Sequence, residues 1–262
     1  MNRSFLMALS LAIATSAAAG PAVAASVVGL MPDNRIIIFD SDKPGLAKTT
    51  AISGVQGKIL GIDVRPADRK LYAVSDADMI YTIDPWTGAA SMVSKLSTSF
   101  KGGEKAVVDF NPVADRLRLM GANGTNFRVH PDTGAVTADG TLAFAANDRN
   151  AGKKPAVAAG AYTNAMAGAR ETALYNLEPT MGALLLQSPP NDGVQQTRGP
   201  LGVKLKPTVA FDITSDGAGG NVAYALADKT LYTVNLETGK ATKVRELKKL
   251  PALIDIAVLP AK

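Results

Sequence analysis

Four aspartates stand at equivalent places in four short apolar segments, and they have the clearest capacity for chemistry. The segments read Gly-Ile-Asp-Val, Val-Val-Asp-Phe, Ala-Phe-Asp-Ile and Leu-Ile-Asp-Ile, with the acids at Asp63, Asp109, Asp212 and Asp255. Carboxylates facing one channel would raise one another's pKa or hold Ca²⁺, which prefers oxygen ligands. Each acid could instead accept backbone hydrogen bonds within its own repeat unit. Because a residue repeated in most units is usually structural, we favour that interpretation and expect no metal.

Polar side chains depart from the repeat pattern mainly in one unit. Arg118, Asn126 and Arg128 stand where other units carry Tyr, an aliphatic residue, and Thr, Asn or Ile, respectively. A buried guanidinium needs a carboxylate or another anion, so nearby acids are the expected structural partners of Arg116, Arg118 and Arg128. Those acids are Asp109, Asp115 and Asp132. The functional alternative is that Arg118, Asn126 and Arg128 bind an anionic or polyhydroxylated ligand.

Two long connections, at residues 143–155 and 188–207, are rich in Asn, Asp, Gly and basic residues. Long loops on a rigid scaffold commonly carry binding, so Asp148, Asn150 and Asn191 join the candidate ligand site. Trp86, the single tryptophan, lies in the turn Asp-Pro-Trp-Thr-Gly. Because a sugar site normally has stacked aromatic residues, we expect this lone Trp to pack locally.

Composition excludes several kinds of chemistry. The chain has 262 residues, no Cys and one His, so disulfides, thiolate metal sites, iron–sulfur clusters and multi-histidine zinc sites are excluded. The phosphate-binding, dinucleotide-binding and serine-hydrolase motifs are also absent. Carboxylate, amide, hydroxyl and guanidinium groups remain.

A repeated pattern predicts the fold that must position these groups. A strand-like segment followed by a turn glycine recurs five times, at intervals of 43–57 residues, with the glycines at Gly45, Gly88, Gly134, Gly182 and Gly239. An Asp-bearing segment precedes most of these repeats and is typical of an innermost strand. This period matches the four-stranded blade of a β-propeller. We therefore predict an all-β fold with five blades, four or six being the alternatives.

The two ends of the chain predict how the ring closes. Residues 253–259 form an inner-strand segment with no hairpin after it, whereas the first hairpin, residues 27–45, has no inner strand before it. We expect the C-terminal strand to complete the N-terminal blade, which leaves few free sheet edges.

The first 24 residues have the features of a bacterial signal peptide. Arg3 supplies the positive end, residues 5–19 are apolar, and Ala22-Val23-Ala24 forms a small-residue cleavage site. We expect a mature single-domain chain of residues 25–262, periplasmic or secreted, with no membrane anchor after cleavage. The formal net charge of +5 is too diffuse for nucleic-acid binding.

The stretch from Val108 to Tyr162 resembles the DUF4394 family of exported bacterial proteins. The likeness rests on Asp-Phe-Asn-Pro-Val-Ala-Asp-Arg-Leu-Arg at residues 109–118, Pro-Asp-Thr-Gly at 131–134, Asp-Gly-Thr-Leu at 139–142 and Ala-Tyr-Thr-Asn at 161–164. Asn126, Arg128, Pro-Pro-Asn-Asp-Gly at 189–193 and Gly-Pro-Leu-Gly at 199–202 extend it over nearly all of the mature chain. The resemblance implies a propeller-like protein outside the cytoplasm and brings no known reaction.

These observations favour a binding or interaction module whose partner is a small molecule or a protein. The alternative is a propeller hydrolase or lyase that acts on a small ester, lactone or glycan through a carboxylate-bound metal such as Ca²⁺. A catalytic site would bring at least three oxygen ligands and an acid–base residue into one pocket. A binding module needs only a patch.

Overall fold

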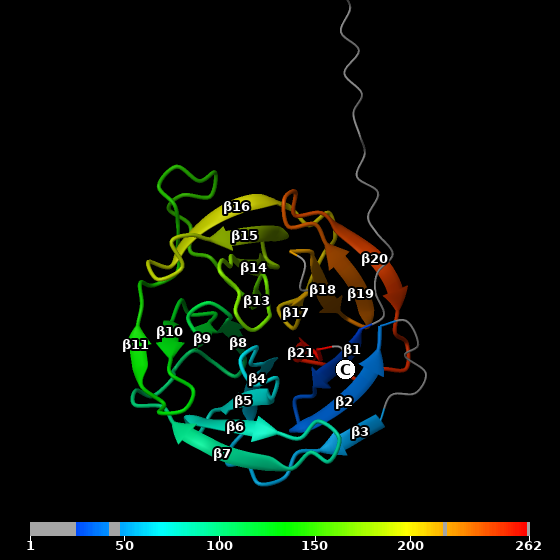
Figure 1. Ribbon diagram of the computed structural model, residues 1–262. Coiled ribbons are helices and arrows are strands. Elements are labelled where there is room, and N and C mark those ends of the chain that lie inside the picture. Colours follow the sequence, from blue (N-terminus) through cyan, green and yellow to red (C-terminus); the bar gives the residue numbers. More distant parts are fainter. Residues whose placement is uncertain (1–24, 42–47, 217–218, 261–262) are drawn as a thin grey trace, which may run out of the picture.

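The computed structural model describes residues 25–41, 48–216 and 219–260. In this part of the chain every regular element is a strand, and the strands form five small sheets arranged as a five-bladed β-propeller (Figure 1). The predicted signal peptide and Gly45 lie outside the described residues. None of the described segments is a helix long and apolar enough to cross a membrane.

Four blades have four strands each, which follow one another from the axis outward. Blade one contains β21 (Asp255–Val258), β1 (Ser26–Leu30), β2 (Arg35–Asp40) and β3 (Lys48–Ala51). Blade two contains β4 (Ile59–Val64), β5 (Leu71–Ser75), β6 (Met79–Ile83) and β7 (Ala90–Lys95). Blade three contains β8 (Ala106–Asn111), β9 (Arg116–Gly121), β10 (Asn126–Val129) and β11 (Val136–Ala138). Blade five contains β17 (Ala210–Ser215), β18 (Asn221–Ala227), β19 (Thr230–Val234) and β20 (Ala241–Glu246).

Blade four departs from the pattern. It has five strands, in the order β13 (Ala159–Tyr162), β14 (Leu174–Glu178), β15 (Ala183–Gln187), β16 (Val194–Pro200) and β12 (Ala143–Phe144), and β12 pairs parallel to β16. The repeat at residues 174–178 is therefore the second strand of its blade, whereas its counterparts β2, β6, β10 and β19 are third strands. The predicted alignment of the repeat units is wrong at blade four, because residues 174–178 form β14, which pairs directly with the inner strand β13.

The two long connections also differ from the prediction. Residues 188–207 include all of β16, and residues 143–155 begin with β12, so neither is a simple link between blades. The link from blade four to blade five is the shorter segment that follows β16. The polar composition of these stretches gave no indication that they contain the two outer strands of blade four, β16 and β12.

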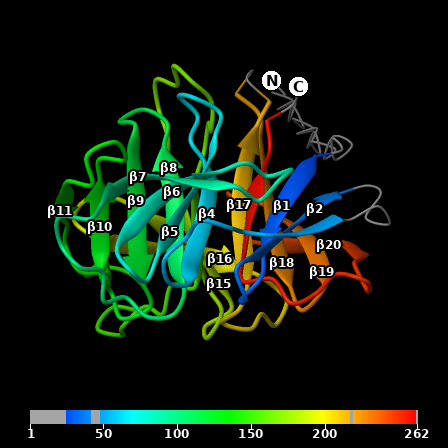
Figure 2. The ribbon, with the colours of Figure 1, turned by 90° about the horizontal axis from the view of Figure 1, so that it is seen from below.

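The predicted closure is confirmed. Strand β21 pairs antiparallel with β1, and Val27 lies opposite Val258. Figure 2 shows β21, in red, between β17 and the blue strand β1. The inner edge of β1 is thereby covered, as ring closure requires.

The apolar core consists of five layers, one at each junction between neighbouring blades. At some of these junctions a turn glycine on the outer side lets the backbones of two neighbouring blades approach closely. Gly134 has a φ of +71°, and a Cβ there would lie 1.8 Å from the carbonyl oxygen of Lys95 in the preceding blade. That turn also accepts a backbone hydrogen bond from Ser97 at 2.9 Å. A side chain at Gly134 would thus separate blades two and three.

Candidate functional sites

The four predicted aspartates gather at the centre of the ring. Asp63, Asp109, Asp212 and Asp255 lie on the inner strands β4, β8, β17 and β21, and each is 5–7% exposed. One carboxylate oxygen from each of Asp63, Asp109 and Asp212 lies within 4.8 Å of the other two. The inner strands have therefore brought together groups that lie far apart in the sequence, at positions 63, 109 and 212.

Backbone hydrogen bonds show what these carboxylates do in the fold. Three of them accept the N–H of the following residue, in Val64, Ile213 and Ile256. All four also accept an N–H from the inner strand of the next blade, at 2.6–2.9 Å: Asp255 from Ile62, Asp63 from Phe110, Asp109 from Tyr162 and Asp212 from Val258. The acids therefore tie neighbouring blades together, a wider role than the expected bond within one repeat unit.

The junction between blades four and five has no such acid, because β13 reads Ala-Gly-Ala-Tyr. Lys105, which immediately precedes β8, reaches this junction instead. Its ammonium donates to the carbonyl oxygen of Ala158 at 2.8 Å and to that of Val209. Four junctions are thus bridged by carboxylates and the fifth by the partly buried ammonium of Lys105.

Crowding of buried charge shifts the proton affinities at the axis. Burial, followed by repulsion from Asp212, raises the pKa of Asp63 well above its ordinary value, and burial followed by repulsion from Asp63 does the same for the pKa of Asp109. Burial raises the pKa of Asp212 to about 6 and that of Asp255 to about 7. Burial also lowers the pKa of Lys105 to about 8.

A cation such as Ca²⁺ would relieve this repulsion, and Asp63, Asp109 and Asp212 are the residues that could hold it. Calcium takes six to eight oxygen ligands in proteins. Three carboxylates that already accept backbone hydrogen bonds supply only part of such a shell. The observed bonds support the structural role of the acids, and metal binding stays a prediction.

A second cluster surrounds Arg118, which is 1% exposed. Its guanidinium donates to Asp139 at 2.6 Å, to Asn126 at 2.9 Å, to Asn191 at 3.0 Å and to the Tyr162 hydroxyl at 3.1 Å. Arg118 lies opposite Arg128 in the register of β9 and β10. Three residues of the predicted ligand site, Asn126, Arg128 and Asn191, thus lie around Arg118.

The acid that pairs with these arginines is not one of those predicted. Arg128 donates to both carboxylate oxygens of Asp139, at 2.7 and 3.0 Å. Asp115 and Asp132 instead hold Arg65 of the preceding blade, at 2.5 and 2.8 Å. Asp109 faces the axis. Solvent reaches this cluster at Arg128, whose side chain is 36% exposed, and at Asn191, which is also exposed.

Asp148 and Asn150 form a separate group. Asp148 accepts hydrogen bonds from the backbone N–H and the hydroxyl of Thr197 on β16, and Asn150 donates to the same hydroxyl. These bonds hold the loop after β12 against the outer edge of blade four. The structure shows no contact between this pair and the arginine cluster within the described residues, so the predicted six-residue site divides in two.

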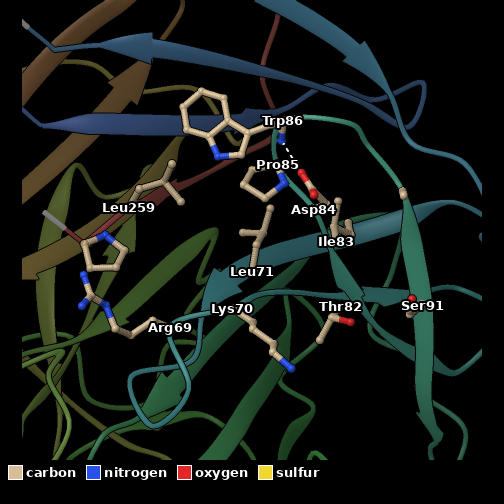
Figure 3. A pocket seen from close by; sticks show the side chains of 12 residues that line it. Arg69, Lys70, Leu71, Thr82, Ile83, Asp84, Pro85, Trp86, Ser91 and Leu259 are labelled. Carbon is tan, nitrogen blue, oxygen red and sulfur yellow. Dashed lines mark hydrogen bonds between the residues drawn. The ribbon is translucent and has the colours of Figure 1, made fainter. Parts of the chain in front are cut away.

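A cleft of about 550 Å³ lies elsewhere, at blade two (Figure 3). Leu71, Ile83, Pro85 and Leu259 form much of its apolar wall, and Trp86 stands on one side with Arg69, Lys70 and Thr82 across from it. Trp86 is 53% exposed, contrary to the expectation that it packs locally. The turn that carries it is held by Asp84, which accepts hydrogen bonds from the N–H groups of Trp86 and Thr87.

One signal in the sequence could have indicated this cleft. The corresponding turns in blades three and five carry Asp132 and Glu237 in the position of Trp86. Trp86 therefore departs from its repeat column in the same manner as Arg118 and Arg128. The cationic side of the cleft, Arg69 and Lys70, has no such signal, because it comes from a connecting loop.

The sheets, their closure and their order define this protein as a five-bladed β-propeller with buried charged clusters. The chain belongs to the domain of unknown function family DUF4394, whose model matches residues 35–257. A comparison with curated proteins gives no match.

Among solved structures, a protein of unknown function from Bacteroides thetaiotaomicron VPI-5482 is similar, with a TM-score of 0.55 and 15% identity over 90% of this chain and 67% of that one. An auxiliary nutrient binding protein from Bacteroides ovatus ATCC 8483 has a TM-score of 0.46 and 14% identity over 82% of this chain and 57% of that one. The first likeness shows the fold alone, and the second is too distant to support an inference.

Proposed function

We propose that this protein is an exported module that binds a small molecule in the cleft beside Trp86. The observation that carries the proposal is a half-exposed indole on the wall of a cleft of about 550 Å³. Small-molecule sites are commonly concave, mostly apolar and of about 300–1,000 Å³, with a few polar groups that orient the ligand. The cleft has this composition, and its walls come from the sheet of blade two, two of its turns and the segment that follows β21.

The position of the cleft also favours binding over catalysis. None of the four axial aspartates lines it, so the acids with raised pKa are separate from the cleft. Its carboxylate, Asp84, has its pKa lowered by the hydrogen bonds from Thr87 and Trp86, which makes it a poor proton donor near neutral pH. These features support a site that holds a ligand without transferring a proton to it.

A panel of small ligands tests the proposal. The panel should contain neutral sugars, sugar acids, amino acids and aromatic compounds, and the readout is the shift in melting temperature of the protein. A binder should raise the melting temperature of the wild type and of Met92→Ala, an exposed residue of the same blade, but not that of Trp86→Ala. A panel in which no compound acts, or in which Trp86→Ala responds fully, would exclude this cleft as the site.

Export is a separate part of the proposal and rests on the signal-like residues 1–24. Mass spectrometry of the extracytoplasmic fraction should find a mature chain that starts at Ala25. An intact Met1 in that fraction would contradict it.

A metal-dependent hydrolase or lyase acting on a small ester, lactone or glycan is the second candidate, favoured by the three axial carboxylates within 4.8 Å of one another. Elemental analysis of the purified protein distinguishes the two. Stoichiometric metal that is lost in Asp109→Asn would support the metal candidate. A metal content that Asp109→Asn leaves unchanged would remove it.

A further inference from the structure

We infer that the outer edge of blade four binds an acidic polysaccharide. This edge consists of the loop at residues 145–155 and the adjacent part of β16, and we name it the basic edge. It contains Asp148 and Asn150 of the sequence-based ligand site. The inference goes beyond the proposed function, because it concerns a second surface that does not depend on the cleft beside Trp86.

An additional strand brings the loop to this place. Among the described residues only blade four has a fifth strand, β12, and Figure 1 shows the loop after it, in green, projecting beyond β16. Asp148 accepts hydrogen bonds from the backbone N–H and the hydroxyl of Thr197, at 2.6 and 2.8 Å. Backbone hydrogen bonds from Ala151 to Asp148 and from Lys153 to Asn150 form successive turns. The loop is therefore held in a defined shape against β16.

A β-bulge adds a cation from the strand itself. The register of β15 and β16 skips Arg198, which is the extra residue of the bulge. The outer strands of blades two and five have the same bulge, where the extra residues are Val93 and Val244, packed against the apolar core. Arg198 is instead exposed. Because the bulge itself does not require an arginine, and bulges often redirect a side chain next to a functional site, Arg198 points to binding.

Exposed cations outnumber acids on the basic edge. The cations are Arg149, Lys153, Lys154 and Arg198. Within the described residues none of them forms an ion pair. Asp148 is the acid of this edge, and even when it is set against its neighbour Arg149, three cations lack a counter-charge. The adjoining turn of blade five adds no net charge, because it carries one acid and one cation, Glu237 and Lys240.

Hydrogen bonds connect the loop cations with the strand cation. The Lys153 ammonium donates to Asn150 at 3.2 Å, and Asn150 donates to Thr197 at 3.1 Å. Thr197 immediately precedes Arg198, so the two groups of cations share one surface. A surface that carries one sign of charge attracts a polymer of the opposite sign. The complementary partner is therefore a polyanion.

The composition of the loop limits the kind of polyanion. It reads Ala-Ala-Asn-Asp-Arg-Asn-Ala-Gly-Lys-Lys-Pro, with no aromatic or large aliphatic residue. Protein interfaces are enriched in aromatic residues, and membrane-binding segments insert Trp, Phe or Leu, so neither partner suits this edge. A nucleic acid does not suit the exported location proposed above. A chain of sugar acids offers carboxylates to the cations and hydroxyls to amides such as Asn147.

Polygalacturonate, a linear polymer of sugar acids, is the probe, and titration calorimetry is the readout. It should bind the wild-type protein at low salt. In about 1 M NaCl, where the screening length is about 3 Å, binding should disappear. Neutral dextran should not bind. Vesicles of phosphatidylserine, which present negative charge without a sugar chain, should bind several-fold more weakly than polygalacturonate.

Variants localise the binding. The triple variant Arg149→Gln/Lys153→Gln/Lys154→Gln should weaken polygalacturonate binding about tenfold, as expected for three charge pairs open to solvent. Arg198→Gln, on the strand, should weaken it about two- to threefold. Both should keep the wild-type melting temperature, because the replaced side chains are exposed.

A matched control removes the same charge elsewhere. Lys58→Gln/Lys95→Gln/Lys101→Gln replaces three exposed cations in or next to blade two and should bind polygalacturonate like the wild type. Trp86→Ala should also bind it like the wild type. A failure of this inference therefore leaves the proposed function of the cleft untouched.

Several results would overturn the inference. Polygalacturonate that does not bind, or that binds the triple variant as tightly as the wild type, removes the basic edge as a site. An equal loss in the control variant would show that net charge alone attracts the polymer. Vesicles that bind as tightly as polygalacturonate, or dextran that binds equally, would show that the ligand class is wrong.

Discussion

Replacing Arg118 and Arg128 by methionine, singly and together, should show whether these arginines form a structural network or bind a ligand. Arg118→Met removes four hydrogen bonds from a side chain that is 1% exposed, and it leaves oxygens of Asn126 and Asn191 without a donor. Asp139 still keeps Arg128. We expect a loss of about 2–4 kcal/mol in the free energy of unfolding, because hydrogen bonds from a charged donor are lost and the buried oxygen of Asn126 is left unsatisfied.

Arg128→Met should cost much less, about 1 kcal/mol or below. Its side chain is 36% exposed, and solvent screens the pair that it forms. Asp139, which is 4% exposed, would keep the bond from Arg118 at 2.6 Å. The double variant should lose more than the sum of the two, by about 1–3 kcal/mol, because the buried carboxylate then has no cation.

Urea unfolding followed by circular dichroism at neutral pH measures all four proteins of this cycle. The reasoning is refuted if Arg128→Met destabilises the protein as much as Arg118→Met, or if the two losses are additive. A ligand role for Arg128 predicts a different result, in which Arg128→Met leaves stability unchanged and weakens the binding of an anion such as sulfate. Melting both single variants with and without sulfate therefore tests the sequence-based prediction as well.

Three further predictions concern the axis and the closure of the ring. Asp212 and Asp255 hold protons in the folded state that they release on unfolding, since their pKa values rise from 3.8 to about 6 and about 7. Stability should therefore fall as the pH rises from about 4 to about 7. A melting temperature that stays constant or rises over that range would show that the pKa values of these two acids are not raised by folding. Lys105→Met leaves the carbonyl oxygens of Ala158 and Val209 without their donor and should cost about 2–3 kcal/mol in urea unfolding, whereas an unchanged midpoint would mean that solvent replaces the bridge. Truncation after Lys249 removes β21 and exposes the edge of β1, so the shortened chain should aggregate in sedimentation velocity, and a monodisperse chain with the wild-type melting temperature would disprove the closure.

The fold could be predicted because the chain repeats itself. Most inner strands could be identified as apolar segments with one Asp. The incomplete first and last units predicted the closure, in which Val27 pairs with Val258. The same repeats identified Arg118 and Arg128 as departures from the pattern, and the structure places these two residues opposite each other on β9 and β10. Periodicity also misled, because β14 resembles a third strand in sequence and is a second strand in the sheet.

The clusters were harder to predict because their partners come from loops. Asp139 follows β11 and has no counterpart in the repeats, so nothing in the sequence distinguished it from Asp115 or Asp132 as the partner of Arg118. Lys105 presents the same difficulty. Its role depends on its position beside the axis, which only the assembled ring defines. A residue whose type differs from that at the equivalent position of the other units did indicate a special environment, at Arg118 and at Trp86 alike.

The pairing of β21 with β1 has a consequence for the order of events during folding. It joins residues about 230 positions apart, one of the longest sequence separations that this chain allows, and such contacts form late because the loop-closure entropy comes first. Until β21 has paired, the inner edge of β1 stays open. During that interval the partly folded chain exposes a strand edge that can pair with another chain, and only the docking of the last strand covers it.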